Sequence, residues 1–317
     1  MTTLVTGGLG FIGSHVVREL LDHGERVVAT RFGGEPVASF LAPDLGGLLA
    51  VEALDIASPH AVIDLCSSHG VDSIIHLAGT PIGVLPRNEE FRINMGGLLN
   101  IMEAARVTGA RRVSIASSIA VYMGLDGPLR EDMTVGLQPR HAIEAFKKAE
   151  ELLGLHLAGA GGTEMIALRL ASIYGPLYRS LRHWPAQLVH AAVRGRPAPL
   201  DIAGLPPFHR DDHASDLCYV ADAARGVRLV HQSDRLRHTA YNIGGGQDVT
   251  YARFAEAAAS VFPGLDIRME PGTSAQNWPR STFDLTRARE DAGYEPDYTI
   301  EAALTAYADW LRAGNEV

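Results

Sequence analysis

The residues with the clearest chemical meaning form a glycine-rich turn near the start of the chain, where residues 6–15 read TGGLGFIGSH after a short apolar run. Glycines at this spacing allow a tight turn, close approach of the backbone to a pyrophosphate, and packing of the next helix on the preceding strand. The N–H groups and positive dipole at the start of that helix attract phosphates. The alternative is an ordinary strand-to-helix turn without a ligand. We expect a dinucleotide here, bound by Gly7, Gly10, Phe11, Ile12 and Gly13.

The next position that bears on the cofactor is Arg31, which directly follows a predicted strand at residues 26–30. Dinucleotide folds that prefer NAD place an acidic residue here, which accepts hydrogen bonds from the ribose hydroxyls. An arginine cannot accept those bonds, but it can pair with the 2′-phosphate of NADP. We therefore expect NADP, and NAD is the alternative if Arg31 is a solvated loop residue.

Two further strand ends are candidates for cofactor contact. Asp55 follows a predicted strand at residues 49–54, where its carboxylate could meet the adenine amino group while Ile56 packs against the ring. The alternative role for Asp55 is to cap the next helix. The predicted strand at residues 71–76 has a small-residue exit, where the backbone could approach the cofactor. This exit consists of Leu77, Ala78 and Gly79.

Apolar strands that alternate regularly with helices position these candidate residues. The strands lack polar–apolar alternation, which indicates a parallel sheet covered by helices on both faces. We predict an α/β protein with a doubly wound parallel (Rossmann) sheet in residues 1–175. Residues 176–317 are expected to form mainly a smaller α/β substrate-binding lobe, and segments near 214–245 are expected to return to the Rossmann domain.

Composition excludes several classes of protein. A formal net charge of −9 argues against nucleic acid as a partner, and no apolar run is long enough to span a membrane. Cys66 and Cys218 lie far apart without metal-ligand spacing, which favours buried free thiols in a reducing compartment. Residue 1 leads directly into the first strand, so we expect no signal peptide. The expectation is a soluble cytoplasmic protein that acts on a small molecule.

Together the motifs resemble the extended short-chain dehydrogenase/reductases, the NAD-dependent epimerase/dehydratase group. The likeness rests on TGGLGFIGSH, the Asp55-Ile56 pair, IIHLAG at residues 74–79 and SSIAVY at residues 117–122, and it covers most of the chain. It implies an NAD(P)-dependent oxidoreductase or epimerase/isomerase acting on a polar hydroxy or keto substrate, which is sugar-like and possibly nucleotide-activated. It further implies a cofactor contact by Asn94 and a homodimer formed through helices near residues 89–107 and 142–156.

In the family that this chain resembles, a serine after the fifth strand positions the substrate oxygen and a tyrosine exchanges the proton. A lysine four residues after the tyrosine, one turn along the same helix face, holds the nicotinamide ribose. Ser118 matches the serine, and Lys147 fits the lysine best. The tyrosine position then falls on Ile143, which cannot carry a proton. This is the sharpest departure from the family pattern.

Three hypotheses address this departure. In the first, another group replaces the phenol. If Lys148 rather than Lys147 faces the cofactor, His141 and Glu144 share its helix face, and a histidine titrates near neutral pH. Glu144 and Lys148 also have the spacing of an ordinary exposed ion pair. Tyr122 is a further candidate donor, although the family's equivalent tyrosine mainly packs. In the second hypothesis the cofactor stays but the reaction is an isomerisation, elimination or cyclisation; in the third, the protein binds NADP without turnover.

The substrate half departs from the family in one more place. Family members that act on nucleotide-sugars use two arginines on the substrate diphosphate, and the first of these positions is Ser215 here. Loss of that arginine removes a charge-assisted contact unless a nearby arginine replaces it. The two histidines between residues 209 and 213 lie in a predicted loop, so we expect no metal. The predicted substrate contacts are Thr80, Ser118, Ser172, Arg210 and Arg280.

Overall fold

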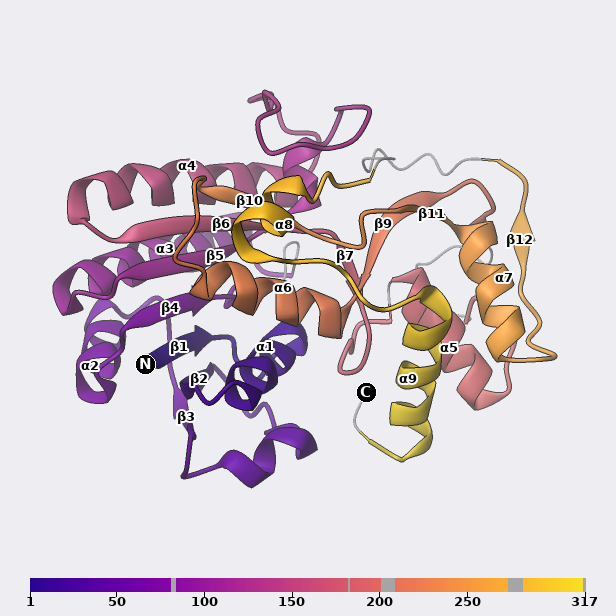
Figure 1. Cartoon of the computed structure of the whole chain (residues 1–317), viewed down its shortest axis with the longest axis horizontal. Coiled ribbons are helices and arrows are strands. Elements are labelled where there is room, and N and C mark those ends of the chain that lie inside the picture. The colour runs from indigo at the N-terminus through magenta and orange to yellow at the C-terminus, as the bar shows by residue number, and fades with distance from the viewer. Residues whose placement is uncertain (81–83, 182, 201–208, 273–281, 316–317) are drawn as a thin grey trace.

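A seven-stranded parallel sheet forms the larger part of the molecule (Figure 1). Its strand order is β10-β6-β5-β4-β1-β2-β3, and every neighbouring pair runs parallel. The computed structural model describes residues 1–80, 84–181, 183–200, 209–272 and 282–315. The strands are β1 (Thr2–Thr6), β2 (Arg26–Arg31), β3 (Leu49–Ala53), β4 (Ser73–His76), β5 (Arg112–Ser118), β6 (Glu164–Leu170) and β10 (Ala240–Ile243).

Helices cover both faces of this sheet. On one face α1 (Phe11–Asp22) packs against α6 (Val220–Gln232), and α8 (Thr286–Ala292) lies beside α6 and β10. On the other face lie α2 (Pro59–His69), α3 (Arg87–Thr108) and α4 (Ala142–Gly161), each packed on the next. The short helices η1 (Ser39–Asp44) and η2 (Ile119–Tyr122) complete this part of the chain. The doubly wound parallel sheet predicted from the sequence is confirmed.

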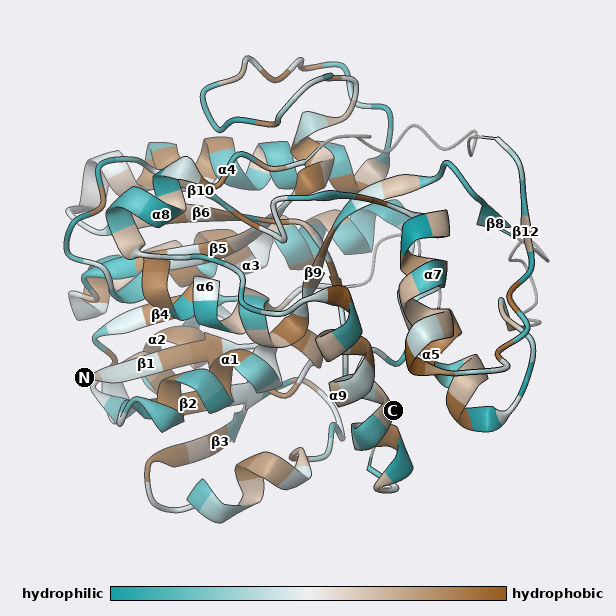
Figure 2. Cartoon of the chain, turned by 45° about the vertical axis from the view of Figure 1, so that its right-hand side comes forward, coloured by the Kyte–Doolittle hydropathy of each residue, from teal (hydrophilic) through white to brown (hydrophobic). Residues whose placement is uncertain are grey.

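Successive residues of the central strands enter two different cores, which explains why these strands read as continuous apolar runs. In β1, Val5 packs in the core that contains α1, whereas Leu4 packs in the core that contains α2 and α3. Ile75 and Ile74 divide in the same way in β4. Figure 2 shows strands of this sheet largely in apolar colours, whereas the covering helices carry both hydrophilic and apolar residues.

The second part of the molecule is smaller and lies beyond one end of the sheet (Figure 1). It contains the three-stranded sheet β11-β9-β7 and the two-stranded β12-β8, with α5, α7 and α9 packed together. Its strands are β7 (Ser172–Tyr174), β8 (His209–Arg210), β9 (Ala214–Tyr219), β11 (Asp248–Thr250) and β12 (Met269–Glu270). Its helices are α5 (Trp184–Arg194), α7 (Tyr251–Val261) and α9 (Ile300–Arg312). The chain returns to the large sheet through α6 and β10, whereas β7 already belongs to the smaller one.

The strand order of the large sheet predicts where a ligand would bind. From β1 the chain continues outward through β2 and β3, and it then crosses to β4 on the other side of β1. In open α/β sheets of this kind the binding crevice lies outside the carboxyl ends of the strands at such a reversal. The exits of β1 and β4 therefore define the candidate site.

Candidate functional site

The glycine turn after β1 has the geometry of a phosphate cradle. Gly7 has φ +67°, in the left-handed region, and the Gly10 N–H donates to the Gly7 carbonyl at 2.9 Å. A Cβ on Gly13 would lie 2.1 Å from the Gly7 oxygen, and a Cβ on Gly7 would lie 3.0 Å from the backbone of Ala78. The turn therefore has no room for side chains at these positions. The first residues of α1, Phe11 and Ile12, follow it directly, and no side chain caps the helix at Gly10.

Neighbouring strands hold this cradle through polar groups that the sequence interpretation missed. The Gly7 N–H donates to the Thr30 hydroxyl at 3.2 Å, and the Ala78 N–H donates to the Thr6 hydroxyl at 3.3 Å. Thr6 Oγ1 also lies 2.7 Å from His76 Nδ1. Burial, together with the charge of Lys147, lowers the pKa of His76 to about 3. The signal in the sequence was a polar residue at the end of each otherwise apolar strand.

The predicted adenosine-side residues lie at the ends of β2 and β3. Arg31 is half-buried, and its Nη1 lies 3.4 Å from the Glu35 carbonyl oxygen. Asp55 Oδ1 accepts the Ala57 N–H at 2.9 Å, which is a local turn contact and not a cap of α2, because the N-cap position of that helix is Ser58. Ile56 is buried against α3, where a Cβ on Gly97 would lie 2.6 Å from its Cδ1. Little of the Ile56 side chain remains for contact with an adenine ring.

Thr80 and Asn94, which were predicted for different roles, connect the exit of β4 to α3 through hydrogen bonds. Asn94 Oδ1 accepts the Thr80 N–H at 3.0 Å, and Asn94 Nδ2 donates to the Thr80 hydroxyl at 3.1 Å. Gly79 allows this approach, since a Cβ there would lie 2.9 Å from Asn94 Oδ1. The Leu77 N–H continues the ladder by donating to the Thr6 carbonyl. These contacts fix the backbone at residues 77–80, and they use the side-chain hydroxyl predicted to bind substrate.

Lys147 lies on α4, which packs on η2, β5 and β6, and its charge acts on His76 at the end of β4. Its Nζ lies 2.7 Å from Oε2 of Glu150, and the two side chains are only 25% and 12% exposed. Burial raises the pKa of Glu150, and the Lys147 ammonium opposes that effect. Ile143 lies one turn before Lys147 on the same helix face and is half-buried. Sequence reasoning missed Glu150, although a carboxylate three residues after a lysine was a visible signal.

Lys148 does not face the β4 exit with Lys147. Its Nζ donates to the Gly136 carbonyl and to Glu144 Oε1, both at 2.5 Å. Glu144 Oε2 also accepts the Arg140 N–H at 2.6 Å, and the Glu144 side chain is 1% exposed. The expectation of an exposed Glu144–Lys148 pair was therefore wrong in one respect: the pair forms, but it is buried beneath the segment that precedes α4.

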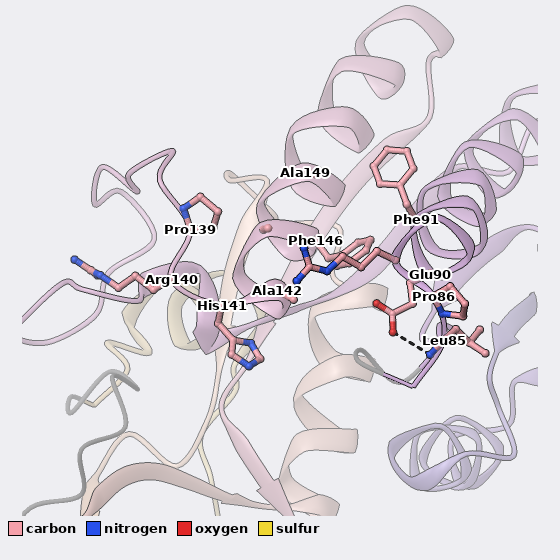
Figure 3. Close-up of a pocket in the computed structure, with 12 residues that line it drawn as sticks. Leu85, Pro86, Glu90, Phe91, Pro139, Arg140, His141, Ala142, Phe146 and Ala149 are labelled. Carbon is pink, nitrogen blue, oxygen red and sulfur yellow. Dashed lines mark hydrogen bonds between the residues drawn. The ribbon is translucent and has the colours of Figure 1, made fainter.

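His141 begins α4 and is exposed, and its Nδ1 accepts the Ile143 N–H at 3.2 Å. His141 also lines a pocket of about 830 Å³ between the first turns of α3 and α4 (Figure 3). The rings of Phe91 and Phe146 are 6.4 Å apart there. Neither Lys147 nor Ser118 lines this pocket, so it is separate from the predicted reaction site.

Tyr122 is not available as a proton donor, and that prediction is corrected. Its side chain is fully buried, its hydroxyl donates to Asn242 Oδ1 at 2.8 Å, and it accepts from Arg169 Nη1 at 2.8 Å. Burial also raises the pKa of Tyr122, against the opposing effect of Arg169. Ser118 ends β5 beside η2, where its hydroxyl accepts the Ala120 N–H at 3.1 Å and the residue is half-buried.

Two of the remaining predicted substrate residues, Ser172 and Arg210, lie in the smaller part of the molecule. The hydroxyls of Ser172 and Ser215 lie 2.7 Å apart and join β7 to β9. Arg210 Nη1 donates to the Pro271 carbonyl at 2.9 Å and pairs with Glu270, so its recorded contacts lie in the β8–β12 ribbon. Arg280 falls outside the described residues. Among the residues described, no group of three or more His, Cys, Asp or Glu side chains is placed to hold a metal ion, and no helix is long and apolar enough to cross a membrane.

Comparison with known proteins identifies the family. The model of the NAD dependent epimerase/dehydratase family matches residues 3–244. The chain belongs to this family. It is 25% identical to UDP-glucuronate 4-epimerase of Thermodesulfobacterium geofontis, over 99% of this chain and 97% of that protein. It is 26% identical to dTDP-glucose 4,6-dehydratase of Xanthomonas campestris, over 98% and 92%.

A solved structure, MoeE5 in complex with UDP-glucuronic acid and NAD, superposes on this chain with a TM-score of 0.81. The sequences are 30% identical over 99% of this chain and 100% of that one. The family predicted from the motifs is therefore confirmed, as is the prediction of an enzyme of the epimerase/dehydratase type. The glycine turn of this family member fits a pyridine dinucleotide, since Gly7 and Gly13 let the turn pack closely on β4 and on the start of α1, whose N–H groups can then meet a pyrophosphate.

Proposed function

We propose that this protein is an NAD(P)-dependent epimerase or oxidoreductase whose substrate is a nucleotide-activated sugar. The placement of Lys147 carries the proposal: α4 packs on η2 and β5, beside Ser118 at the end of β5, and the Lys147 charge acts on His76 next to the glycine turn. In this proposal the Lys147 ammonium lies at the redox end of a dinucleotide bound on that turn. The similarity to UDP-glucuronate 4-epimerase and dTDP-glucose 4,6-dehydratase supports the choice of substrate class.

In this proposal the chain's own residues bind and orient the two ligands. A bound nicotinamide would supply acceptance and return of a hydride. The amides at the start of α1 hold the pyrophosphate, and Ala78 and Gly79 border it from the β4 exit. Lys147 holds the nicotinamide ribose, and Ser118 orients the substrate oxygen. Ile143 contributes no proton, so the proton donor differs from that of the family pattern.

The proposal includes a preference for NADP. Arg31 ends β2, where a dinucleotide's adenosine ribose would lie, and no carboxylate occupies that position. The guanidinium makes one recorded hydrogen bond, at 3.4 Å, to a backbone oxygen, so little holds it away from a 2′-phosphate. The solved relatives whose cofactor is named contain NAD, which makes the preference a direct test of Arg31.

The proposal also includes a homodimer and a cytoplasmic location. Large apolar side chains are exposed along the outer surfaces of α3 and α4, among them Phe91 at 59% and Leu152 at 67%. A second copy of the chain would bury this surface, together with Leu99, Val107 and Leu155. The location is supported by Cys66 and Cys218, which are both buried and free.

The test begins with binding and proceeds to turnover. NADPH and NADH are titrated by fluorescence, and the protein is then incubated with UDP-glucuronic acid, UDP-glucose and dTDP-glucose together with NADP⁺ or NAD⁺. Products are separated by chromatography, and the absorbance of the reduced nicotinamide is followed. Formation of an isomer or a dehydrated sugar supports the proposal. Dinucleotide binding without conversion of any of these sugars overturns the substrate class.

A second candidate function is a dinucleotide-binding protein without turnover, and Ile143 is the observation that favours it. The variant Ile143→Tyr restores a phenol one turn before Lys147. Under the second candidate the wild-type protein binds NADPH but is inactive, and the variant gains activity. Activity of the wild-type protein excludes this candidate.

A further inference from the structure

Lys147 and Lys148 are the only lysines among the chain's 28 basic residues, and the other 26 are arginines. The two lysines stand side by side on α4, the helix that faces the β4 exit. Lysine and arginine differ in one chemical property that matters in a reaction site. A guanidinium does not lose its proton in a protein, whereas an ammonium can donate one and take it back.

Contacts explain why Lys148 is a lysine. Its ammonium fits between the Gly136 carbonyl and Glu144, at 2.5 Å from each oxygen. A planar guanidinium is larger and presents its donors in a fixed fork, so it would not fit these two acceptors in the same space. Lys148 is therefore required by the packing of the segment that precedes α4.

Ion pairing does not explain why Lys147 is a lysine. Its recorded partner is Glu150, three residues later on the helix. Elsewhere in the described residues the chain builds helical pairs at the same spacing with arginine, as in Arg106–Glu103, Arg225–Asp222 and Arg312–Asp309. The ion pair with Glu150 alone therefore does not account for the choice of lysine at position 147.

The titratable groups around Lys147 come from two elements. His76 approaches from β4, and Glu150 and Glu151 lie on α4 itself. His76 is buried and its pKa is lowered to about 3, so it is neutral at physiological pH. Glu151 is bound by Arg169 through two hydrogen bonds, at 3.0 and 2.7 Å. Glu150 is therefore the carboxylate available to hold the Lys147 ammonium.

We propose that Lys147 itself exchanges the proton with the substrate oxygen, and that Glu150 is the positioning residue that holds its ammonium group. This inference rests on the proposed function and names the group that takes the place of the missing phenol. The position one turn before Lys147 is occupied by Ile143, which has no titratable group. Tyr122, Glu144 and Glu151 are each bound in buried networks elsewhere.

The proton transfer accompanies the redox step with the pyridine dinucleotide. In reduction of a substrate carbonyl, a bound reduced nicotinamide would supply the hydride to the carbon. The oxygen forms its O–H bond with a proton from the Lys147 ammonium, whose N–H bond breaks, and an amine is left beside Glu150. In the reverse step this amine takes the proton back from the hydroxyl as the carbon gives up its hydride. Atoms and charge balance without a further reactant.

The experiment compares Lys147→Arg with Lys148→Arg, the same chemical change one residue along the helix. NADPH affinity is measured first, by fluorescence, and turnover is then measured on the best substrate among UDP-glucuronic acid, UDP-glucose and dTDP-glucose. We expect Lys147→Arg to bind NADPH within about tenfold of wild type and to lose at least a hundredfold in kcat, because it keeps the charge but cannot exchange the proton. Lys148→Arg disturbs a packed contact away from the proposed reaction site, so we expect it to lower thermal stability but to keep the kcat of the folded protein within about threefold of wild type.

Glu150 is tested by a spectroscopic readout that does not need turnover. With lysine-selective ¹⁵N labelling only two side-chain signals exist, and Lys148→Arg identifies which of them belongs to Lys147. In the otherwise wild-type chain, Glu150→Gln should shift the Lys147 ammonium signal and speed its hydrogen exchange at least tenfold, and it should lower kcat more than it raises KM. An unchanged signal overturns the role of Glu150.

The outcomes separate the inference from the function on which it rests. If wild type converts none of the three sugars, the proposed function fails and this inference fails with it. If wild type is active and Lys147→Arg keeps more than a tenth of its kcat, the function stands and Lys147 is not the proton-exchanging group. Loss of activity in His141→Asn together with an active Lys147→Arg would assign the proton to His141 instead.

Discussion

Arg31 offers the sharpest test of how the chain selects its cofactor. In Arg31→Ala the guanidinium is removed, while the half-buried backbone of β2 keeps its pairing with β1 and β3. Because the guanidinium's recorded hydrogen bond in the free protein is long, at 3.4 Å, the variant loses little stability. The loss should appear almost entirely in binding of the 2′-phosphate.

The size of that loss follows from the contact that Arg31 would make. A hydrogen bond to a charged group contributes about 1.5–3 kcal/mol. Since each 1.4 kcal/mol is a factor of ten, NADPH should bind about 10- to 150-fold more weakly to Arg31→Ala. NADH lacks the 2′-phosphate, so its affinity should change by less than about threefold.

Fluorescence titration of NADPH and NADH measures both affinities on one preparation. Arg26→Ala is the matched control, because Arg26 begins the same strand that Arg31 ends and its side chain is exposed. It should leave the NADPH-to-NADH affinity ratio unchanged. The reasoning is refuted if Arg31→Ala weakens both dinucleotides equally, or if wild type already binds NADH more tightly than NADPH.

Three further predictions concern stability and assembly. Glu151→Ala leaves the Arg169 guanidinium buried without its carboxylate partner. The free energy of unfolding, measured in urea, should therefore fall by about 3–5 kcal/mol. A loss below about 1 kcal/mol would contradict the pairing of Glu151 with Arg169. Burial, together with the charges of Arg112 and Arg111, lowers the pKa of His231 from its ordinary 6.5 to about 3. As pH falls, the His231 side chain is therefore protonated in the unfolded chain before it is protonated in the folded protein. The free energy of unfolding should decrease between about pH 6.5 and pH 3. His231→Asn should therefore flatten the dependence of unfolding free energy on pH by about 1.4 kcal/mol per unit in that range, and an unchanged slope would mean that His231 is protonated in the folded state. Leu152→Glu should halve the molar mass measured by light scattering. The control variant Leu137→Glu, at an exposed position outside α3 and α4, should leave the mass unchanged. Equal masses for wild type and Leu152→Glu would oppose a dimer formed through these helices.

Local patterns in the sequence were sufficient for the fold and for the phosphate cradle. Spacing alone placed Gly7, Gly10 and Gly13, since each contact of the turn lies within a few residues or on the adjacent strand. Apolar runs without alternation predicted a covered parallel sheet, because each strand supplies both cores. These features depend on interactions that a short segment of chain already specifies.

The parts that could not be predicted depend on distant partners. The Tyr122 hydroxyl is occupied by Asn242 and Arg169, which lie 120 and 47 residues away. The four-residue spacing between Glu144 and Lys148 occurs in exposed and in buried ion pairs alike, so the spacing alone does not predict burial. The burial of Glu144 is set by the Gly136 carbonyl and the Arg140 N–H in the preceding segment. Such contacts become visible only once the chain is folded.

The anchoring of α4 decides between Lys147 and Lys148, and with it the meaning of Ile143. Glu151 fastens the helix to β5, where it accepts from the Ser117 hydroxyl, and to β6 through Arg169. One residue in a helix corresponds to about 100° of rotation, so turning Lys148 toward the β4 exit would pull Glu151 away from its partners and leave Arg169 buried and unpaired. With Lys147 thus fixed in place, Ile143 occupies the position one turn before it. Because α4 keeps its register, position 143 still lies where the family has its tyrosine. Only the side chain at that position differs from the family pattern.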